Sequence, residues 1–228
     1  MDDPYCYPPP HNDILINKPG LLDNDKLQAF ETAKSAVRFD TLLNKPIIGS
    51  FNQDHLQKIH QYIFQDVYPW AGEIRSISIF KSERILSGAS VNYSSPGLIS
   101  DDLKTALAHL KSINFERNVF DVSKDLSKTV PAIWQIHPFR EGNTRSLAAF
   151  IASYTKTKGF EIDPYALAKH YGKDSFRDAM VASCFDMPEH AHKRFISARE
   201  AVINRHKSMP LDRSRQGIQY GSDKDRSR

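Results

Sequence analysis

Nine residues between two predicted helices, His137-Pro138-Phe139-Arg140-Glu141-Gly142-Asn143-Thr144-Arg145, combine side chains that could bind a polyphosphate and move a proton. The first turn of a helix exposes unpaired amide groups and carries about half a positive charge, so it attracts anions. Glu141 could ligate a metal, Asn143 and nearby amides could bind phosphate oxygens, and Arg145 could form a bidentate clamp. His137 is placed to take a proton from an attacking hydroxyl group.

Each of these residues also has an ordinary structural interpretation. A histidine at a helix end can cap it, a Glu-Gly-Asn sequence can form a turn, and the following arginine can be solvated. Their occurrence in one short segment makes a shared site the better interpretation. The sequence lacks the lysine pattern of a P-loop, which excludes ordinary P-loop chemistry.

Hydrophobic periodicity predicts a mainly α fold that positions this segment between two central helices. The expected helices cover residues 23–40, 53–64, 99–113, 121–136, 145–156, 175–185 and 190–207. Asn52 is expected to cap the second helix, and Pro131 should kink the fourth or start a new one. His55 and His60 share a helix at the wrong spacing for one ligand face, so packing or solvation is expected for both.

The period changes at residues 73–80, where polar and apolar residues alternate. Such alternation predicts a half-buried strand, and residues 89–93 could pair back with it to make a β-hairpin. The expected architecture is therefore a helical bundle with one β-hairpin.

The central segment resembles the Fic motif, HxFx(D/E)GNGRxxR, and matches it at His137, Phe139, Glu141, Gly142, Asn143 and Arg145. Residues 64–75 look like the stretch that leads into the Fic active-site hairpin, and residues 5–8 and 16–18 are similar to the usual N-terminal arm. The resemblance spans residues 5–205. It divides the chain into a Fic domain at residues 1–206, opened by an extended arm at 1–20, and a disordered basic tail at 207–228.

This resemblance implies a protein adenylyltransferase that moves AMP from ATP to a Ser, Thr or Tyr hydroxyl of a target protein and releases pyrophosphate. It assigns the general base to His137 and an Mg²⁺ ligand to Glu141. Phosphate binding falls to Gly142, Asn143, Thr144 and Arg145. The hairpin at residues 74–93 corresponds to the family's flap, which binds an extended piece of the target by strand addition. The implied target-binding residues are Ile77, Ser78, Ile79, Phe80 and Lys81.

Two positions depart from the motif. Thr144 stands where the family has its second glycine, and Ala148 stands where it has a final arginine that helps to bind the γ-phosphate and pairs with an inhibitory glutamate. The family's inhibitory pattern, (S/T)xxxE(G/N), is followed by residues 112–116 but broken by Arg117. We therefore expect self-inhibition of that kind to be absent, while a small antitoxin partner stays open.

Other functions also stay open. A Fic enzyme could transfer another nucleotide, because the motif says little about the base. Phosphorylation, as in the death-on-curing toxins, is disfavoured because those toxins depart from Glu-Gly-Asn. A degenerate Fic fold could act only as a nucleotide- or partner-binding module, and Thr144 and Ala148 are the features that keep this alternative.

The composition of the 228 residues, 40% hydrophobic and 25% charged, fits a globular domain. No apolar run approaches the ~20 residues of a membrane span, and the acidic N-terminus does not look like a signal peptide. We expect a cytoplasmic protein without membrane contact, or one delivered into another cell by a different route. Cys6 and Cys184 are interpreted as reduced thiols. The basic tail lacks interleaved aromatic residues, which argues against nucleic acid.

Overall fold

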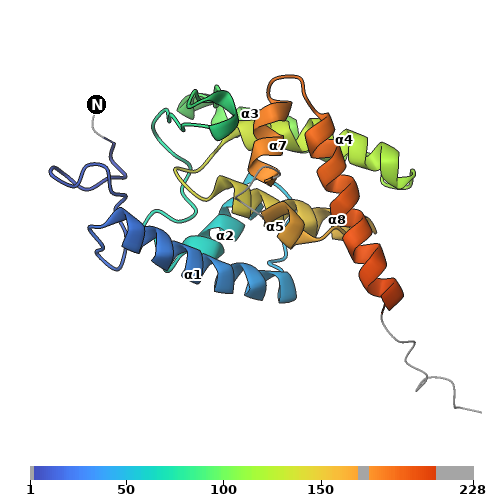
Figure 1. Cartoon of the computed structure of the whole chain (residues 1–228), viewed down its shortest axis with the longest axis horizontal. Helices are drawn as coiled ribbons and strands as arrows, with labels where there is room; N and C mark the ends of the chain where they lie inside the picture. The colour runs from blue at the N-terminus through green and yellow to red at the C-terminus, as the bar shows by residue number, and fades with distance from the viewer. Residues whose placement is uncertain (1–2, 169–174, 209–228) are drawn as a thin grey trace, which may run out of the picture.

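Helices provide nearly all the regular structure in the computed structural model, which describes residues 3–168 and 175–208 (Figure 1). They are α1 Asn24–Asn44, α2 Gln53–Phe64, α3 Ile99–Lys111, α4 Val119–Ile136, α5 Asn143–Thr157, α6 Pro164–Ala168, α7 Phe176–Ser183 and α8 Glu189–Ser208, with short 3-10 turns η1 Arg84–Leu86 and η2 Pro96–Leu98. The predicted mainly α class is confirmed. The predicted tail at 207–228 lies outside the described residues from 209 onward.

Several helices begin at the capping residues that their sequences supply. Asn52 accepts a hydrogen bond from the amide of His55 at 3.0 Å, and α2 has the predicted bounds. Asp23 and Asn118 cap α1 and α4 in the same way. A side-chain oxygen at the cap satisfies an amide that has no partner within the helix, which fixes where each helix starts.

Helical spacing predicts that the first helix carries its apolar face at Leu27, Phe30, Ala33 and Val37, and the buried face of α1 differs from this in part. The helix continues past residue 40 to Asn44 and buries Leu27, Phe39 and Leu42, whereas Val37 is 66% exposed. The helical face between these apolar residues carries Glu31 and Ser35. Because two polar residues lie on the inward face, hydrophobic periodicity alone pointed to the wrong side.

The fourth helix continues through its proline. Pro131 lies inside α4, so of the two outcomes predicted there, a kink or a new helical start, the new start does not occur. α4 packs on α3, α7 and α8, and Pro131 itself is buried. This surrounding packing offsets the cost of the hydrogen bond that proline cannot donate.

No β-strand forms in residues 3–168 or 175–208, so the predicted hairpin is not confirmed. Residues 74–93, called the flap segment below, form an extended loop carrying η1. The predicted alternation is visible in exposure, since Ile77 and Ile79 are half-buried while Ser78 and Phe80 are exposed. A half-buried extended segment needs a hydrogen-bonding partner to become a strand, and this segment forms no ladder.

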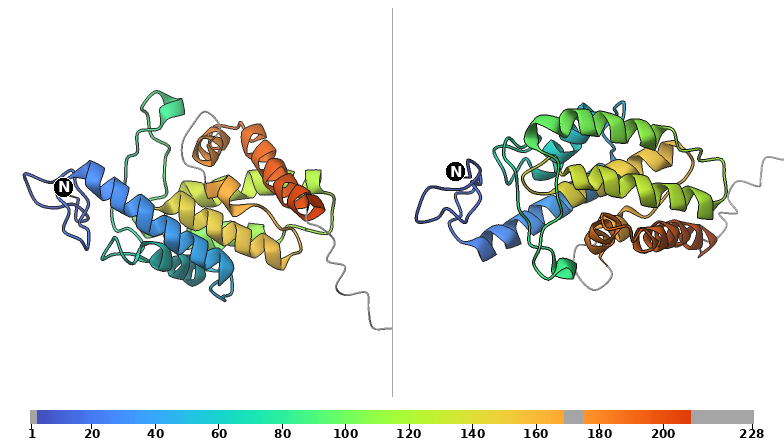
Figure 2. Two further views of the ribbon diagram at one scale, coloured as in Figure 1. Left: turned by 60° about the horizontal axis from the view of Figure 1, so that its bottom comes forward. Right: turned by 90° about the horizontal axis from the view of Figure 1, so that it is seen from above.

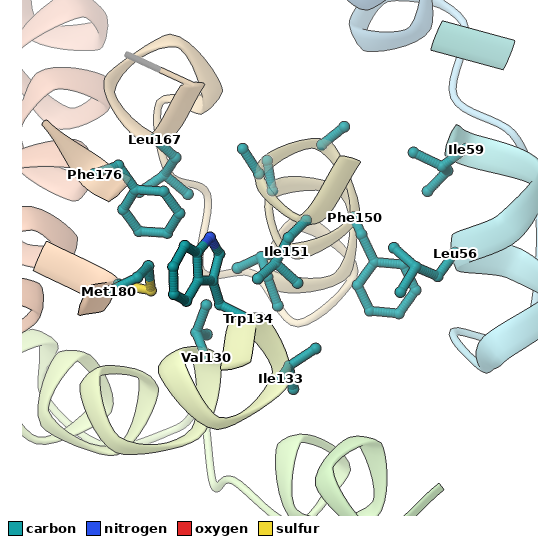
Figure 3. Close-up of a cluster of buried hydrophobic side chains, with 14 of the residues drawn as sticks. Leu56, Ile59, Val130, Ile133, Trp134, Phe150, Ile151, Leu167, Phe176 and Met180 are labelled. Carbon is teal, nitrogen blue, oxygen red and sulfur yellow. The ribbon is translucent and has the colours of Figure 1, made fainter. Parts of the chain in front are cut away.

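α5 lies among the other helices (Figure 2), and buried apolar side chains from several of them gather around it (Figure 3). Phe150 of α5 faces Leu56 of α2, while Ile151 faces Trp134 of α4. α7 adds Met180 on the far side of Trp134. The loop between α4 and α5 therefore joins two helices that are packed in the core, and this packing fixes the position of both of its ends. None of the helices in the described residues has both the length and the low polarity of a membrane span.

Candidate active site

The loop between α4 and α5 makes two sharp turns. His137 ends α4 in the left-handed region at φ +52°, and Gly142 precedes α5 at φ +80°. A Cβ at Gly142 would lie 2.3 Å from the ring of Phe64, so only glycine fits both the conformation and the space. We call residues 137–145 the catalytic loop.

His137 is buried, with 2% of its surface exposed, and its ring orientation is fixed. Its Nδ1–H donates to the Trp134 carbonyl at 3.2 Å, and the ring packs against Tyr93 at 4.2 Å between centroids. Burial, and then the nearby Lys81, lower the pKa of His137 well below its ordinary value. The ring is therefore neutral, and Nε2 forms no hydrogen bond with the described residues. A neutral ring with a free Nε2 lone pair is what a general base requires.

The Glu141 carboxylate is ionised and oriented by two neighbours. Oε1 accepts from the amide of Gly142 at 3.0 Å, and Oε2 pairs with Lys81 Nζ at 2.5 Å. Burial alone would raise the pKa of Glu141, but the Lys81 charge and hydrogen bond outweigh it and the pKa is lowered. No cluster of three or more acidic, His or Cys side chains that could hold a metal ion occurs in the described residues. One carboxylate still fits Mg²⁺, which is commonly held by one or two carboxylates and substrate phosphates.

Asn143 braces the loop through its side chain. Its Nδ2 donates to the Phe139 carbonyl at 2.7 Å, and its Oδ1 accepts from the Phe139 amide at 2.9 Å. Phe139 is 1% exposed, which agrees with the role that the Fic resemblance implies for it, a core anchor that fixes the loop. The predicted phosphate contact of Asn143 is thus left to its backbone amide in this arrangement. Gly142 supplies no capping side chain to α5, so no side chain caps the first-turn amides of Asn143, Thr144 and Arg145.

The two departures from the motif both face the core. The Thr144 hydroxyl accepts from Trp134 Nε1–H at 3.0 Å and the residue is 4% exposed. This contact pins the start of α5 to the end of α4. Ala148 has no exposed surface, so its position in α5 is filled by packing.

Arg145 points toward α1, where it lies within a largely buried polar cluster. Its guanidinium pairs with Glu31, donates to Ser35 Oγ at 2.6 Å and lies over the Phe64 ring at 4.7 Å. Tyr68 donates its hydroxyl to the same Glu31 carboxylate. Arg145 Nε–H has no partner among the described residues. The guanidinium of Arg145, which was predicted to bind phosphate, is therefore already paired with one carboxylate, that of Glu31.

Two residues support the loop from outside in a way that sequence reasoning missed, although packing was one of the outcomes expected for the first, His60. His60 of α2 accepts from the Gly72 amide at Nδ1 (2.8 Å) and donates from Nε2 to the Glu141 carbonyl (2.9 Å). Its ring stacks on Phe139 at 3.8 Å between centroids. The available signal was its place on the apolar face of α2, because a polar side chain there needs a buried partner.

Arg75 is the second missed residue, and it joins the catalytic loop to the flap segment. It is 2% exposed and donates to the carbonyls of His137 (2.7 Å), Ile77 (2.6 Å), Ser94 (2.5 Å) and Ile136 (3.3 Å). Its amide also donates to the Pro138 carbonyl at 2.9 Å. A charged arginine within an alternating pattern resembles an ordinary surface residue, so the sequence carried no distinct signal for it.

The five predicted target-binding residues divide into two groups. Ile77, Ser78, Ile79 and Phe80 run along the flap segment, with Phe80 73% exposed. Lys81 instead turns inward to Glu141 and its side chain is 11% exposed. The inhibitory pattern at residues 112–116 lies in the turn between α3 and α4 rather than in a helix.

Comparison of the sequence with known proteins finds relatives of this chain. The model of the Fic/DOC family matches residues 50–155. The chain is 32% identical over 193 residues to the protein adenylyltransferase VbhT of Bartonella schoenbuchensis, covering 79% of this chain and 38% of VbhT. It is 30% identical over 189 residues to the probable protein adenylyltransferase y4lH of Sinorhizobium fredii, covering 80% of this chain and 88% of y4lH. The chain thus spans well under half of VbhT but most of y4lH.

Solved structures share the fold at lower identity. The N-terminal Fic domain of a VirB-translocated Bep effector from Bartonella quintana has a TM-score of 0.71 and 22% identity, covering 92% of this chain and 99% of that domain. BepC of Bartonella tribocorum, solved with bound AMPPNP, has a TM-score of 0.70 and 20% identity, covering 85% of this chain and 95% of that chain. Both relatives are similar in architecture across almost the whole described chain.

Proposed function

This chain belongs to the Fic/DOC family of enzymes, and from that premise we propose that it is a protein adenylyltransferase. It transfers AMP from ATP to a Ser, Thr or Tyr hydroxyl of a target protein and releases pyrophosphate. The observation that carries the proposal is the neutral, buried His137, whose free Nε2 lies in the same short loop as an uncapped helix N-terminus. A base and an anion site so close together suit attack by a hydroxyl on a phosphate.

In the proposed reaction, His137 Nε2 takes the proton from the target hydroxyl. The hydroxyl oxygen forms a bond to the α-phosphorus of ATP while the bond from that phosphorus to the α,β-bridging oxygen breaks. Pyrophosphate leaves with the bridging oxygen. The Trp134 carbonyl holds Nδ1–H throughout, which keeps the ring in the tautomer that leaves Nε2 basic.

Phosphate binding falls on the start of α5. The backbone amides of Asn143 and Thr144, after the turn at Gly142, would bind α-phosphate oxygens, because the helix dipole favours charge there. Arg145 would bind the β- and γ-phosphates, keeping Glu31 as its second partner. Glu141 would hold Mg²⁺, which when bound neutralises charge on the phosphates.

Target binding is assigned to the flap segment. Residues 77–80 are extended, alternate in exposure and form no ladder with the rest of the described chain. An extended peptide of the target could therefore add beside them through main-chain hydrogen bonds, which read little sequence. The exposed Phe80 ring would supply an apolar contact.

The proposal also covers compartment and partners. The enzyme works in a cytoplasm, either its own or, as for the VirB-translocated structural relatives, that of another cell. The proposal allows a small antitoxin partner that inhibits the enzyme in trans. Transfer of another nucleotide by the same mechanism is the alternative within this family.

Incubation with α-labelled ATP and Mg²⁺ in a cell lysate tests the function. Wild type should label a protein band, and His137→Ala should reduce the label by about a hundred-fold or more, because a general base contributes 10²–10⁴. His109→Ala, at an exposed position of α3, is the matched control and should label like wild type. Equal labelling by His137→Ala would overturn the role of His137. Absence of ATP binding by wild type would favour the alternative of a degenerate Fic fold that only binds a partner.

A further inference from the structure

Lys81 places a positive charge directly on the carboxylate that the reaction needs. Its Nζ lies 2.5 Å from Glu141 Oε2, and its side chain is 11% exposed. The backbone of Lys81 belongs to the flap segment, while Glu141 belongs to the catalytic loop. This ion pair therefore connects the two regions across the site.

Both oxygens of Glu141 are engaged. Oε1 accepts from the Gly142 amide and Oε2 from Lys81. A divalent magnesium ion takes oxygen ligands at about 2.0–2.1 Å. An ion at that distance from Glu141 would stand within a few ångströms of the Lys81 ammonium, where like charges repel strongly. The carboxylate therefore cannot serve both cations well at once.

We propose that Lys81 is a built-in competitor of the metal: it occupies Glu141 in the metal-free protein, and nucleotide-bound Mg²⁺ displaces it. This inference rests on the proposed function, since it requires a nucleotide with its metal at Glu141. Glu141 keeps a cationic partner throughout the exchange, because the Lys81 ammonium leaves the carboxylate as the metal arrives. Lysine suits it, since its charge sits on a flexible four-carbon stem that can withdraw without moving the loop.

Displacement of Lys81 also removes an anchor of the flap segment. Two other anchors tie this segment to α7: Arg84 pairs with Asp178 at 2.5 Å, and Glu83 accepts two hydrogen bonds from Arg177 at 2.7 and 2.9 Å. These contacts do not involve Glu141. Metal binding therefore removes one contact between the segment and the catalytic loop, while the hydrogen bonds of Arg75 to the loop and the ion pairs on α7 stay in place.

Calorimetric titration with ADP, with and without Mg²⁺, tests the competition. In wild type the metal must displace Lys81 from Glu141, and this cost reduces the gain in ADP affinity that Mg²⁺ provides. In Lys81→Met the gain in ADP affinity on adding Mg²⁺ should exceed the wild-type gain by about five-fold or more, a usual size for coupling between two ligands. Lys81→Arg keeps a cation on Glu141 and should behave like wild type. Arg84→Met is the matched control, because it removes an ion pair of the same segment without touching Glu141.

The same titrations separate the ways in which the idea can fail. An equal Mg²⁺ benefit in wild type and Lys81→Met would overturn the competition while leaving the proposed function standing. Weaker ADP binding by Lys81→Met without Mg²⁺ would also overturn it, because Lys81 would then be a phosphate ligand. If wild type binds no ADP, both proposals fall.

Hydrogen exchange in the absence of nucleotide checks the anchor independently. The amides of Glu83 and Gly88, which form main-chain hydrogen bonds within the flap segment, should exchange faster in Lys81→Met than in wild type. Lys81→Arg should restore slow exchange. Unchanged exchange in Lys81→Met would show that the ion pair does not hold the segment, which overturns the anchoring part of the proposal.

Discussion

The catalytic loop and the flap segment face each other across the site but are stabilised in opposite ways. The loop is buried, and its main chain is held by His60, Asn143 and Arg75. Beyond Arg75 the flap segment lacks a ladder and is held by side-chain ion pairs, of which Glu83–Arg177 is largely buried whereas Arg84, paired with Asp178, is 59% exposed. Exposed ion pairs contribute little to stability, typically below about 1 kcal/mol. The loop is thus rigid, and the segment is the part able to move.

This contrast suits an enzyme that must place one substrate accurately and accept another of variable shape. Groups that bind phosphates and move a proton need fixed geometry, which buried, fully bonded residues supply. A surface that receives a protein target gains from low local stability, because little is lost when it adjusts. Arg75 belongs to both regions, so it sets how far the flexible segment can depart from the rigid loop.

Removing the hydrogen bonds of Arg75, which connect the two regions, should have the largest effect on stability. Arg75→Met leaves buried carbonyls of both regions without their donor, so we expect the free energy of unfolding to fall by about 4 kcal/mol or more, since each unsatisfied buried group costs 1–3 kcal/mol. Urea denaturation measures the change. Arg38→Met is the control, because Arg38 and its partner Asp66 are about one-third exposed; it should cost about 1 kcal/mol or less. Equal losses of unfolding free energy in the two variants would contradict the proposed role of Arg75 in connecting the two regions.

Sequence reasoning reached the rigid region better than the flexible one. The motif, the helices on either side and the cap at Asn52 were predictable because local periodicity and capping chemistry determine them. The burial of Phe139 also followed from its expected place in the loop. These features depend on near neighbours in the chain, which a sequence displays directly.

The missed features all depend on partners distant in sequence. Glu31 and Ser35 on the inner face of α1 pair with Arg145, more than a hundred residues away. The alternation that predicted a strand was real in exposure, yet no second segment supplies the ladder. Lys81 looked like one more polar residue of the flap segment until the fold brought Glu141 to it. Polar pairing across the fold has no periodic signature, so only the structure reveals it.

Two glycines at positive φ, one in each region, sharpen the comparison. Gly142→Ala adds a Cβ that would lie 2.3 Å from the Phe64 ring at φ +80°. We expect a loss of about 3 kcal/mol in unfolding free energy, from strain and overpacking together. Gly88→Ala, at φ +95°, places its Cβ 3.5 Å from Ser82 Oγ, an ordinary contact. It should cost only the backbone strain of about 1 kcal/mol. Thermal unfolding of both variants checks this order, and a larger loss for Gly88→Ala would reverse our view of which region is rigid.

Acid should lower the free energy of unfolding through His60, which supports the catalytic loop, because the flap segment contains no histidine. Burial, as the largest cause, lowers the pKa of His60 from 6.5 to about 3 in the folded protein. Below pH 6.5 the unfolded chain therefore binds a proton that the folded protein does not, and stability falls as the pH drops toward 3. Relative to pH 7, the His60 contribution at pH 5 is a loss of about 2 kcal/mol. Urea denaturation of wild type and His60→Gln at both pH values measures it. His60→Gln should be less stable at pH 7, because a hydrogen bond and a ring stack are lost, but its pH 5 to pH 7 difference should be about 2 kcal/mol smaller. An unchanged difference would mean that His60 is not neutral in the folded protein.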